Sequence, residues 1–188
     1  MSSTDAMQIP GYVVGTWTLD PVHTEIGFVV RHMMISKVRG RFETFTGSVT
    51  TAPDPLDSRT EVEVDLSSIT TGNDQRDGHL RSSDFFDVET SPKMTFTSTG
   101  FRQDGGDYLL DGDLTIRGVT KPVSLSVDIG GFGPDSYGGT RAGFSATTEI
   151  NRNDFGVSWN AAVEGGGVVV SDKVTISIEA EAVLDQPQ

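Results

Sequence analysis

Three histidines, His23, His32 and His79, are the side chains of this chain that could bind a metal through an imidazole or act as a general base near neutral pH. None of them stands at the HExxH or HxH spacing that brings two imidazoles to one ion. The chain has no cysteine, which excludes thiolate nucleophiles, disulfides, iron–sulfur clusters and cysteine-bound zinc. We therefore expect no metal site and no cofactor.

The other residue types that carry chemistry in enzymes lack the patterns that such chemistry needs. No GxSxG sequence is present to place a serine on a nucleophile elbow. The glycine-rich stretches Gly130–Gly133 and Gly165–Gly167 match neither a Walker A loop nor GxGxxG, and hairpin turns explain them better. The carboxylates of Glu61, Glu63 and Asp65 alternate with apolar neighbours, which is typical of a solvated strand face. The sequence therefore identifies no catalytic residue.

Net charge and hydropathy exclude two further classes of protein. The 188 residues include 14 Lys and Arg but 27 Asp and Glu, a formal charge of −13, so nucleic acid would be repelled. The most apolar run, Gly27 to Ile35, is interrupted by Arg31 and His32 and is far too short for a transmembrane helix. The first ten residues contain no Lys or Arg and no apolar core of a signal peptide, so we expect a cytoplasmic location.

The elements that must position these side chains are predicted to be strands. The chain has 20 Val and 21 Thr but only 9 Leu, a bias toward β-branched residues. Val62, Val64 and Leu66 alternate with acidic residues, as expected of a half-buried strand. The same reasoning predicts strands over Thr16–Asp20, His23–Met33, Val38–Val49, Lys93–Gln103, Asp107–Arg117, Val123–Ile129, Arg141–Ile150 and Val174–Ala182.

Turns and two short helices are predicted between the strands. Asn73 to Ser83 shows no alternation and predicts one or two helical turns. Ser158 is a plausible N-cap for a second helix that stops at Gly165. Turns are expected at Gly118–Pro122 and Gly130–Gly139.

Strands of this length and number favour one architecture. Several exceed the usual five to six residues, and long coiled strands suit a closed barrel. We predict an all-β fold, an antiparallel up-and-down β-barrel of about eight strands with one or two short helices. Residues 1–188 are expected to form a single domain, ordered from about residue 12 to 184, whose inner face is both core and potential pocket.

Several ordered blocks of this sequence resemble the YceI-like proteins. The run His79–Phe86, followed by Ser91–Thr99, is similar to the central signature of that family. The resemblance extends from about Thr16 to Ala182. The further similar blocks are Trp17–Asp20, followed by His23, and then Phe28–His32, Gly112–Val123, Arg141–Phe144 and Arg152–Gly156. The resemblance implies a lipocalin-like barrel that encloses an elongated amphiphile, such as a polyisoprenoid, an isoprenoid quinone or a fatty amide. It also implies that the chain can form a homodimer. Many family members are exported with a signal peptide, and this chain departs from that pattern.

The residues and the resemblance together predict non-enzymatic binding, storage or transport of a long lipid in the lumen. His32 shares the inward face with Phe28 and Val30, so it either contacts the ligand or forms a hydrogen bond at the barrel rim. The remaining candidate ligand-binding residues are Phe42, Val64, Met94, Phe96, Leu114, Ile116, Leu125 and Phe144 on strands, with Phe86, Phe155 and Trp159 closing one end.

Three further expectations can be tested against the structure. Phe42 and Phe45 are three residues apart, so both point inward only if their strand bulges. A pyrophosphate head group would need converging cations, which Arg81, Arg117, Arg141 and Arg152 supply only if the fold gathers them. The alternatives to a carrier are a solidly packed barrel that acts as a structural or signalling module, and an enzyme with His32 or His23 as the base.

Overall fold

The computed structural model describes residues 8–161, 167 and 169–186. These residues are mostly in long strands, as the composition predicts. The strands are β1 (Gly15–Leu19), β2 (Glu25–His32), β3 (Ser36–Phe42), β4 (Phe45–Thr51), β5 (Arg59–Asp65), β6 (Ile69–Thr70), β7 (Lys93–Asp104), β8 (Asp107–Ile116), β9 (Val119–Pro134), β10 (Thr140–Asn151) and β11 (Lys173–Leu184). The helices are α1 (Asp74–Arg81) and the 3-10 turns η1 (Pro55–Asp57), η2 (Leu66–Ser68) and η3 (Arg152–Phe155).

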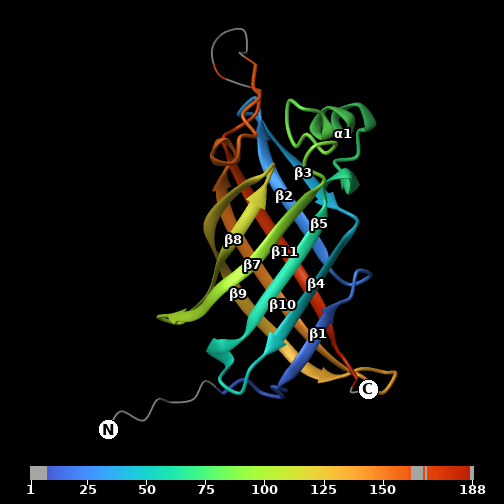
Figure 1. Cartoon of the computed structure of the whole chain (residues 1–188), viewed down its shortest axis with the longest axis vertical. Coiled ribbons are helices and arrows are strands. Elements are labelled where there is room, and N and C mark those ends of the chain that lie inside the picture. Colours follow the sequence, from blue (N-terminus) through green and yellow to red (C-terminus); the bar gives the residue numbers. More distant parts are fainter. Residues whose placement is uncertain (1–7, 162–166, 168, 187–188) are drawn as a thin grey trace.

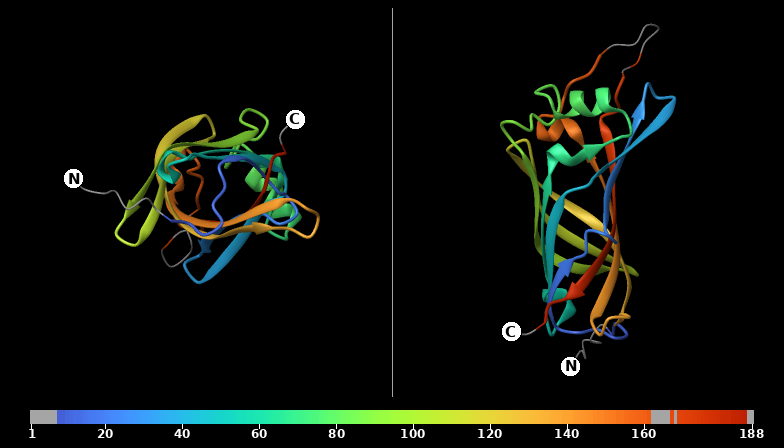
Figure 2. Two further views of the ribbon diagram at one scale, coloured as in Figure 1. Left: turned by 90° about the horizontal axis from the view of Figure 1, so that it is seen from below. Right: turned by 90° about the vertical axis from the view of Figure 1, so that its right-hand side faces the viewer.

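The strands form a closed antiparallel barrel (Figures 1 and 2). Its order is β1-β4-β5-β7-β8-β9-β10-β11, and the pairing of β1 with β11 closes the ring. Closure removes the free edges that an open sheet would expose. The predicted eight-stranded all-β barrel is confirmed.

One edge of β11 serves two partners, which the sequence did not reveal. Ala182 to Leu184 pair with β1, whereas Thr175 to Glu179 pair with β2. The β2–β3 hairpin therefore continues the wall along the upper part of β11, where β1 has ended, and short β6 borders β3. Helix α1 lies at this same end, the upper end in Figure 1.

The prediction of one strand over Val38–Val49 is wrong, because the chain breaks between β3 and β4. The amide of Glu43 donates to the carbonyl of Ser68, and the amide of Thr44 donates to the Ser68 hydroxyl. These bonds take both residues out of the ladder and reset the alternation. Phe42 and Phe45 are consequently both buried without a bulge, at 5% and 8% exposure.

The predicted turns at Gly118–Pro122 and Gly130–Gly139 are both present but shorter than predicted, because β9 includes Val119–Pro122 and the first half of the second segment. The glycines after Ile129 mark a bulge instead: the register with β10 shifts between Gly143 and Phe144. Gly131 there has a φ of 145°, which only glycine adopts readily. The turn itself is short, and the Asp135 carboxylate accepts the amides of Tyr137 and Gly139.

Of the two expected helices, one is confirmed. Helix α1 begins after Asn73, whose side chain accepts the amide of Arg76 as an N-cap. Residues 158–161 are not helical, so the second helix does not begin at Ser158, and residues 162–166 lie outside the described part of the chain. Among the described residues, no helix is long and apolar enough to cross a bilayer.

The two ends of the barrel are covered differently. At the lower end, the segment before β1 runs across the opening (Figure 2, left). Tyr12 stacks edge-on against Phe132 and donates its hydroxyl to the carbonyl of Ala52. Trp17 beside it is fully buried, and its indole N–H donates to the Thr51 hydroxyl at 2.9 Å. The Thr51 hydroxyl donates in turn to the carbonyl of Val13, which ties the segment to the barrel.

Replacing Thr51 with Val tests this lower closure. The variant keeps the shape of the side chain but leaves the buried indole N–H of Trp17 without an acceptor. An orphaned buried donor costs about 1–3 kcal/mol. We expect urea unfolding to show a loss of that size for Thr51→Val. Thr50→Val is the matched control on the exposed face of the same strand, and its stability should stay close to wild type. Equal stabilities for the two variants would contradict this role of Thr51.

Candidate functional site

The barrel interior holds two adjoining cavities. The lower one has a volume of about 180 Å³ and the upper one about 240 Å³. Both exceed the roughly 150 Å³ at which an apolar engineered cavity stays dry and accepts small aromatic ligands. Ile26, Met94 and Ile176 line both cavities, so the two chambers meet at these side chains. The interior therefore holds two neighbouring chambers, together called the lumen here, and these three side chains form the waist between them.

The lower chamber is lined mainly by strand residues, together with residues before β1 and around η1, and none of its lining residues is charged. Phe96 and Phe144 contribute aromatic wall, and both are only partly buried although they face the interior. The Phe96 ring lies against Gly112, where an added Cβ would overlap it. The small residue lets the ring lie flat on the wall instead of filling the space. The polar residues that border this chamber carry hydroxyl groups only, and they are Tyr12, Thr51, Ser58, Thr60, Thr95 and Thr148.

The upper chamber is built from strands, from α1 and from the segments around η3. The inward face of the β2–β3 hairpin supplies Phe28 and Val30, and the Phe28 ring lies against Gly40 as Phe96 lies against Gly112. Phe86 follows α1 and packs edge-on against Phe42. Unlike the lower chamber, this one is also lined by histidine and arginine residues, namely His32, Arg76, His79 and Arg152. Arg31 borders it too, but its side chain lies on the outer face of β2, opposite Lys37.

All the residues predicted to bind the ligand line this lumen. The lower chamber contains Val64, Phe96, Leu114, Leu125 and Phe144, and Met94 borders both chambers. The upper chamber contains Phe28, Val30, His32, Phe42, Phe86, Ile116, Phe155 and Trp159. Their position on the wall is established, whereas their contact with a ligand stays a prediction.

Sequence reasoning missed several wall residues. Ile9 lines the lower chamber although order was expected only from about residue 12, and Tyr12 at that boundary lines it too. Phe132 lies in the stretch that reads as a turn, and it contacts Trp17, Tyr12 and Phe144 edge-on. An aromatic residue inside a glycine-rich stretch was the signal that could have identified it.

His79 also lines the upper chamber. Its ring lies 4.7 Å from that of Trp159 and 5.1 Å from that of Phe85, edge-on in both cases. Nε2 of His79 and Oδ2 of Asp84 are 2.8 Å apart. The histidine thus joins the loop after α1 to the wall of the chamber.

Arg152 is the buried cation of this end, at 5% exposure. Its guanidinium donates to the carbonyls of Val157, Trp159, Val170 and Ser171, at 2.8 to 3.2 Å. Burial lowers its pKa, and Asp172 at 4.0 Å opposes that effect. Its donors are occupied by backbone oxygens, so Arg152 shapes the chamber without offering a free charge.

The four arginines that could have formed a pyrophosphate site are not gathered into one. Arg81 donates to the carbonyls of Ser67 and Ile69, and Arg117 donates to those of Phe85 and Gly156. Arg141 is bound by carboxylates at a different place. Each guanidinium has its own acceptors within the protein.

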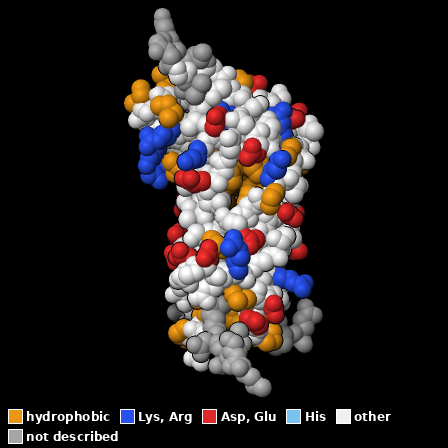
Figure 3. All heavy atoms as spheres, turned by 90° about the vertical axis from the view of Figure 1, so that its left-hand side faces the viewer, with side chains coloured by type: hydrophobic (Ala, Val, Ile, Leu, Met, Phe, Trp, Pro, Cys, Tyr) orange, Lys and Arg blue, Asp and Glu red, His pale blue; other side chains and the backbone are white. Residues whose placement is uncertain are grey.

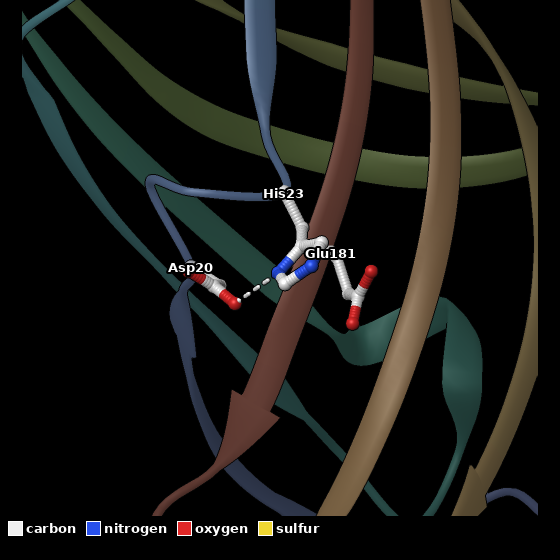
Figure 4. A group of neighbouring side chains, drawn as sticks. All are labelled: Asp20, His23 and Glu181. Atoms are coloured by element: carbon white, nitrogen blue, oxygen red, sulfur yellow. Dashed lines mark hydrogen bonds and ion pairs between the residues drawn. The ribbon is translucent and has the colours of Figure 1, made fainter. Parts of the chain in front are cut away.

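His23 lies in a polar cluster that could be taken for a metal site (Figure 4). One ligand atom from each of Asp20, His23 and Glu181 lies within 4.8 Å of the others, in the one such group found among the described residues. However, Nη1 of Arg141 lies 2.8 Å from Oδ2 of Asp20 and 3.0 Å from Oε1 of Glu181. The guanidinium already supplies the positive charge that a metal would bring. Hydrogen bonds from His23 and then Arg141 hold the pKa of Asp20 far below its usual value.

Comparison with known proteins identifies the family. The family model described as the YceI-like domain matches residues 17–182. The chain belongs to the YceI-like family. The UPF0312 protein plu2095 of Photorhabdus laumondii is 42% identical over 134 residues, which are 71% of this chain and 70% of that protein.

Solved structures show the same fold. BcnA of Burkholderia cenocepacia aligns with a TM-score of 0.76 at 24% identity, over 87% of this chain and 98% of BcnA. A polyisoprenoid binding domain from Saccharophagus degradans aligns with a TM-score of 0.69 at 18% identity, over 92% of this chain and all of that domain. Within this YceI-like chain, the block His79–Phe86 and the block Arg152–Gly156 form the roof of the upper chamber.

The Asp20 cluster gives a pH prediction. Because the folded-state pKa of Asp20 is lowered, its contribution to stability is complete above the unfolded pKa of about 3.9 and is lost as the pH falls below it. We expect Asp20→Asn to be less stable than wild type at neutral pH and the difference to shrink as the pH falls below about 4. Urea unfolding of both proteins across this range measures it. A difference that is constant with pH would show that the lowered pKa does not contribute.

Proposed function

We propose that this YceI-like protein binds one long amphiphilic lipid in its lumen and stores or transports it without catalysing a reaction. The observation that carries the proposal is the polarity of the lumen along its length. The lower chamber has no charged lining residue, whereas the upper chamber, which adjoins it at Met94, is lined by histidine and arginine residues. An apolar tail fits the first chamber and a polar head group the second.

Burial of the tail supplies the binding energy. Each CH₂ that leaves water contributes about 0.8 kcal/mol. A few isoprene units therefore offset the cost of ordering a flexible chain. Cavities that already exist in the folded protein need no side chains to be displaced. Met94 at the waist has an unbranched, adaptable side chain that tolerates a chain passing between the chambers.

The head group that fits best is neutral or weakly charged, and it accepts hydrogen bonds. Arg81, Arg117, Arg141 and Arg152 are separated and bonded to protein oxygens, which disfavours a pyrophosphate. A polyisoprenoid, an isoprenoid quinone or a fatty amide meets these requirements. The polyisoprenoid binding domain of Saccharophagus degradans, which shares the fold, supports the same class of ligand.

The two alternative functions are less well supported by the structure. A solidly packed barrel would leave no cavities of this size. For an enzyme, His23 is unsuitable because it bonds to Asp20 within the Arg141 cluster, away from the residues that line either chamber. His32 lines the upper chamber, but no carboxylate is among the side chains that line it.

Extraction of the purified protein with organic solvent, followed by mass spectrometry, tests the proposal. We expect a retained lipid with a long apolar chain and no pyrophosphate, in a ratio near one per protein. Elemental analysis of the same protein, purified without a histidine tag so that the tag brings no metal, tests the expectation that no metal is bound. A pyrophosphate-bearing lipid would overturn the head-group assignment. Protein that carries no lipid and binds none added to it would overturn the lumen proposal.

Truncating a wall residue distinguishes a lumen from a filled core. Phe96 borders space that is already empty, whereas Leu66 is fully buried and lines neither chamber. Leu66→Ala should cost about 2–5 kcal/mol in urea unfolding of delipidated protein. Phe96→Ala should lower the free energy of unfolding by less than that, although it removes more atoms. It should also weaken lipid binding in titrations. We expect the same two results for Phe144→Ala. If Phe96→Ala costs more than Leu66→Ala and leaves lipid binding unchanged, Phe96 belongs to a filled core.

A further inference from the structure

The outer face of the β2–β3 hairpin is basic in a strongly acidic protein. Four of the 14 Lys and Arg residues lie between positions 31 and 41, and no Asp or Glu lies between positions 26 and 42. Arg31 is directly opposite Lys37, and Arg39 and Arg41 follow on the same face of the hairpin. All four are exposed. Like charges in directly opposed positions destabilise a strand pair, so folding does not account for this arrangement.

The tip of the same hairpin is apolar and exposed. Met33, Met34 and Ile35 are exposed by 38%, 58% and 82%. These three residues connect the paired residues His32 and Ser36, and the amide of Ile35 donates to the carbonyl of His32. Met33 and Met34 have φ values of 52° and 58°. Asn-Gly is the usual sequence for this conformation, so two methionines there are unfavourable for the turn itself.

The hairpin extends beyond the barrel wall. Beyond Arg41, β3 has no strand partner other than β2, because β6 pairs only with Arg41 and Phe42. The pairing of β2 with β11 ends at Val29. Closer to the tip, the edge of β2 is bonded to the segment before β11: Arg31 exchanges hydrogen bonds with Ser171, His32 bridges Val170, and the amide of Met33 donates to the carbonyl of Val169. Figure 2 (right) shows the hairpin standing apart at the upper end. Figure 3, seen from the opposite side, shows basic side chains gathered directly below hydrophobic ones at that edge.

We propose that the β2–β3 hairpin docks the protein on an anionic lipid surface, with Met33, Met34 and Ile35 inserted at the interface and Arg31, Lys37 and Arg39 at the head-group level. An apolar end with cations behind it matches the layers of such a surface. A soluble acidic protein would be complementary to the cations but not to three apolar residues at the very tip. Among the described residues, no ion pair occupies Arg31, Lys37 or Arg39.

The net charge of −13 does not prevent docking in this orientation. The Debye length is about 8 Å at physiological ionic strength, so the surface senses mainly the charges that approach it first. A projecting hairpin with no acidic residue meets that condition. The same physics requires binding to weaken as salt is added.

Docking would bring the lumen close to the lipid surface. The inward face of the hairpin, including Phe28 and Val38, lines the upper chamber, while its outward face carries the cations. A role in loading or releasing the lumen lipid rests on the proposed function, whereas the docking itself does not.

Vesicle sedimentation of the full chain tests the proposal. The probes are vesicles of phosphatidylcholine alone and of an equal mixture of phosphatidylcholine and phosphatidylglycerol. We expect binding to the mixed vesicles, little to the neutral ones, and loss with added salt. Because each Lys or Arg near an anionic surface strengthens binding about fivefold, Arg39→Glu should weaken binding by at least that factor. Ile35→Ser should weaken it as well.

Matched controls use exposed residues away from the hairpin tip. Arg59→Glu makes the same charge change as Arg39→Glu, at the start of β5. Val22→Ser replaces an exposed apolar side chain by serine, as Ile35→Ser does, and Val22 is 83% exposed. Both should bind like wild type. Equal binding by Arg39→Glu and Arg59→Glu, or no binding of wild type to mixed vesicles, overturns the docking proposal. Organic extraction of the same samples keeps the two proposals separate, because retained lipid without vesicle binding overturns docking alone.

Discussion

The sharing of one β11 edge between β1 and β2 is the constraint on which the rest of this structure depends. In a regular closed barrel, this edge of β11 would pair with one strand along its whole length. Here the lower residues close the ring through β1, and the upper residues bind the β2–β3 hairpin. The wall is thereby extended beyond the point where β1 ends. This creates room for a second chamber and leaves the end of one hairpin projecting from it.

The lumen stays open because its aromatic side chains lie along the wall. Phe28 covers Gly40 and Phe96 covers Gly112, in both cases where any Cβ would overlap the ring. An aromatic ring over a glycine on the neighbouring strand uses the space of the missing side chain. A larger residue at either glycine would push the ring out of this position, toward the lumen. Glycine weakens these strands locally. The structure accepts this loss of stability because the glycines make room for the aromatic rings beside the cavity.

The alternation of residues predicts the barrel but not how its strands connect. Val62 and Val64 show which face is buried whatever strand lies beside them, so wall residues of the lumen could be inferred from period two alone. Leu66 continues the pattern into η2 and is buried, but it lines neither chamber. The break at Glu43 and Thr44 could not, because it depends on hydrogen bonds to Ser68, which is distant in sequence. The same holds for Phe132: the glycines around it read as a turn, and only pairing with β10 makes them a bulged strand. Partners that lie far apart in the chain leave no local signal.

The backbone N–H and C=O groups of the barrel wall and of the roof find their hydrogen-bond partners in different ways. In the wall, the neighbouring strands supply these partners. At the α1 end the chain runs through turns and irregular segments whose carbonyls have no ladder, and arginines bind them instead. Arg81 binds Ser67 and Ile69, Arg117 binds Phe85 and Gly156, and Arg152 binds carbonyls from both sides of residues 161–169. A guanidinium suits this task because it offers five donors in a fixed plane. Arginines committed to the roof are unavailable to a charged ligand, so the hydrogen bonds that build the upper chamber also support the proposal of a neutral head group.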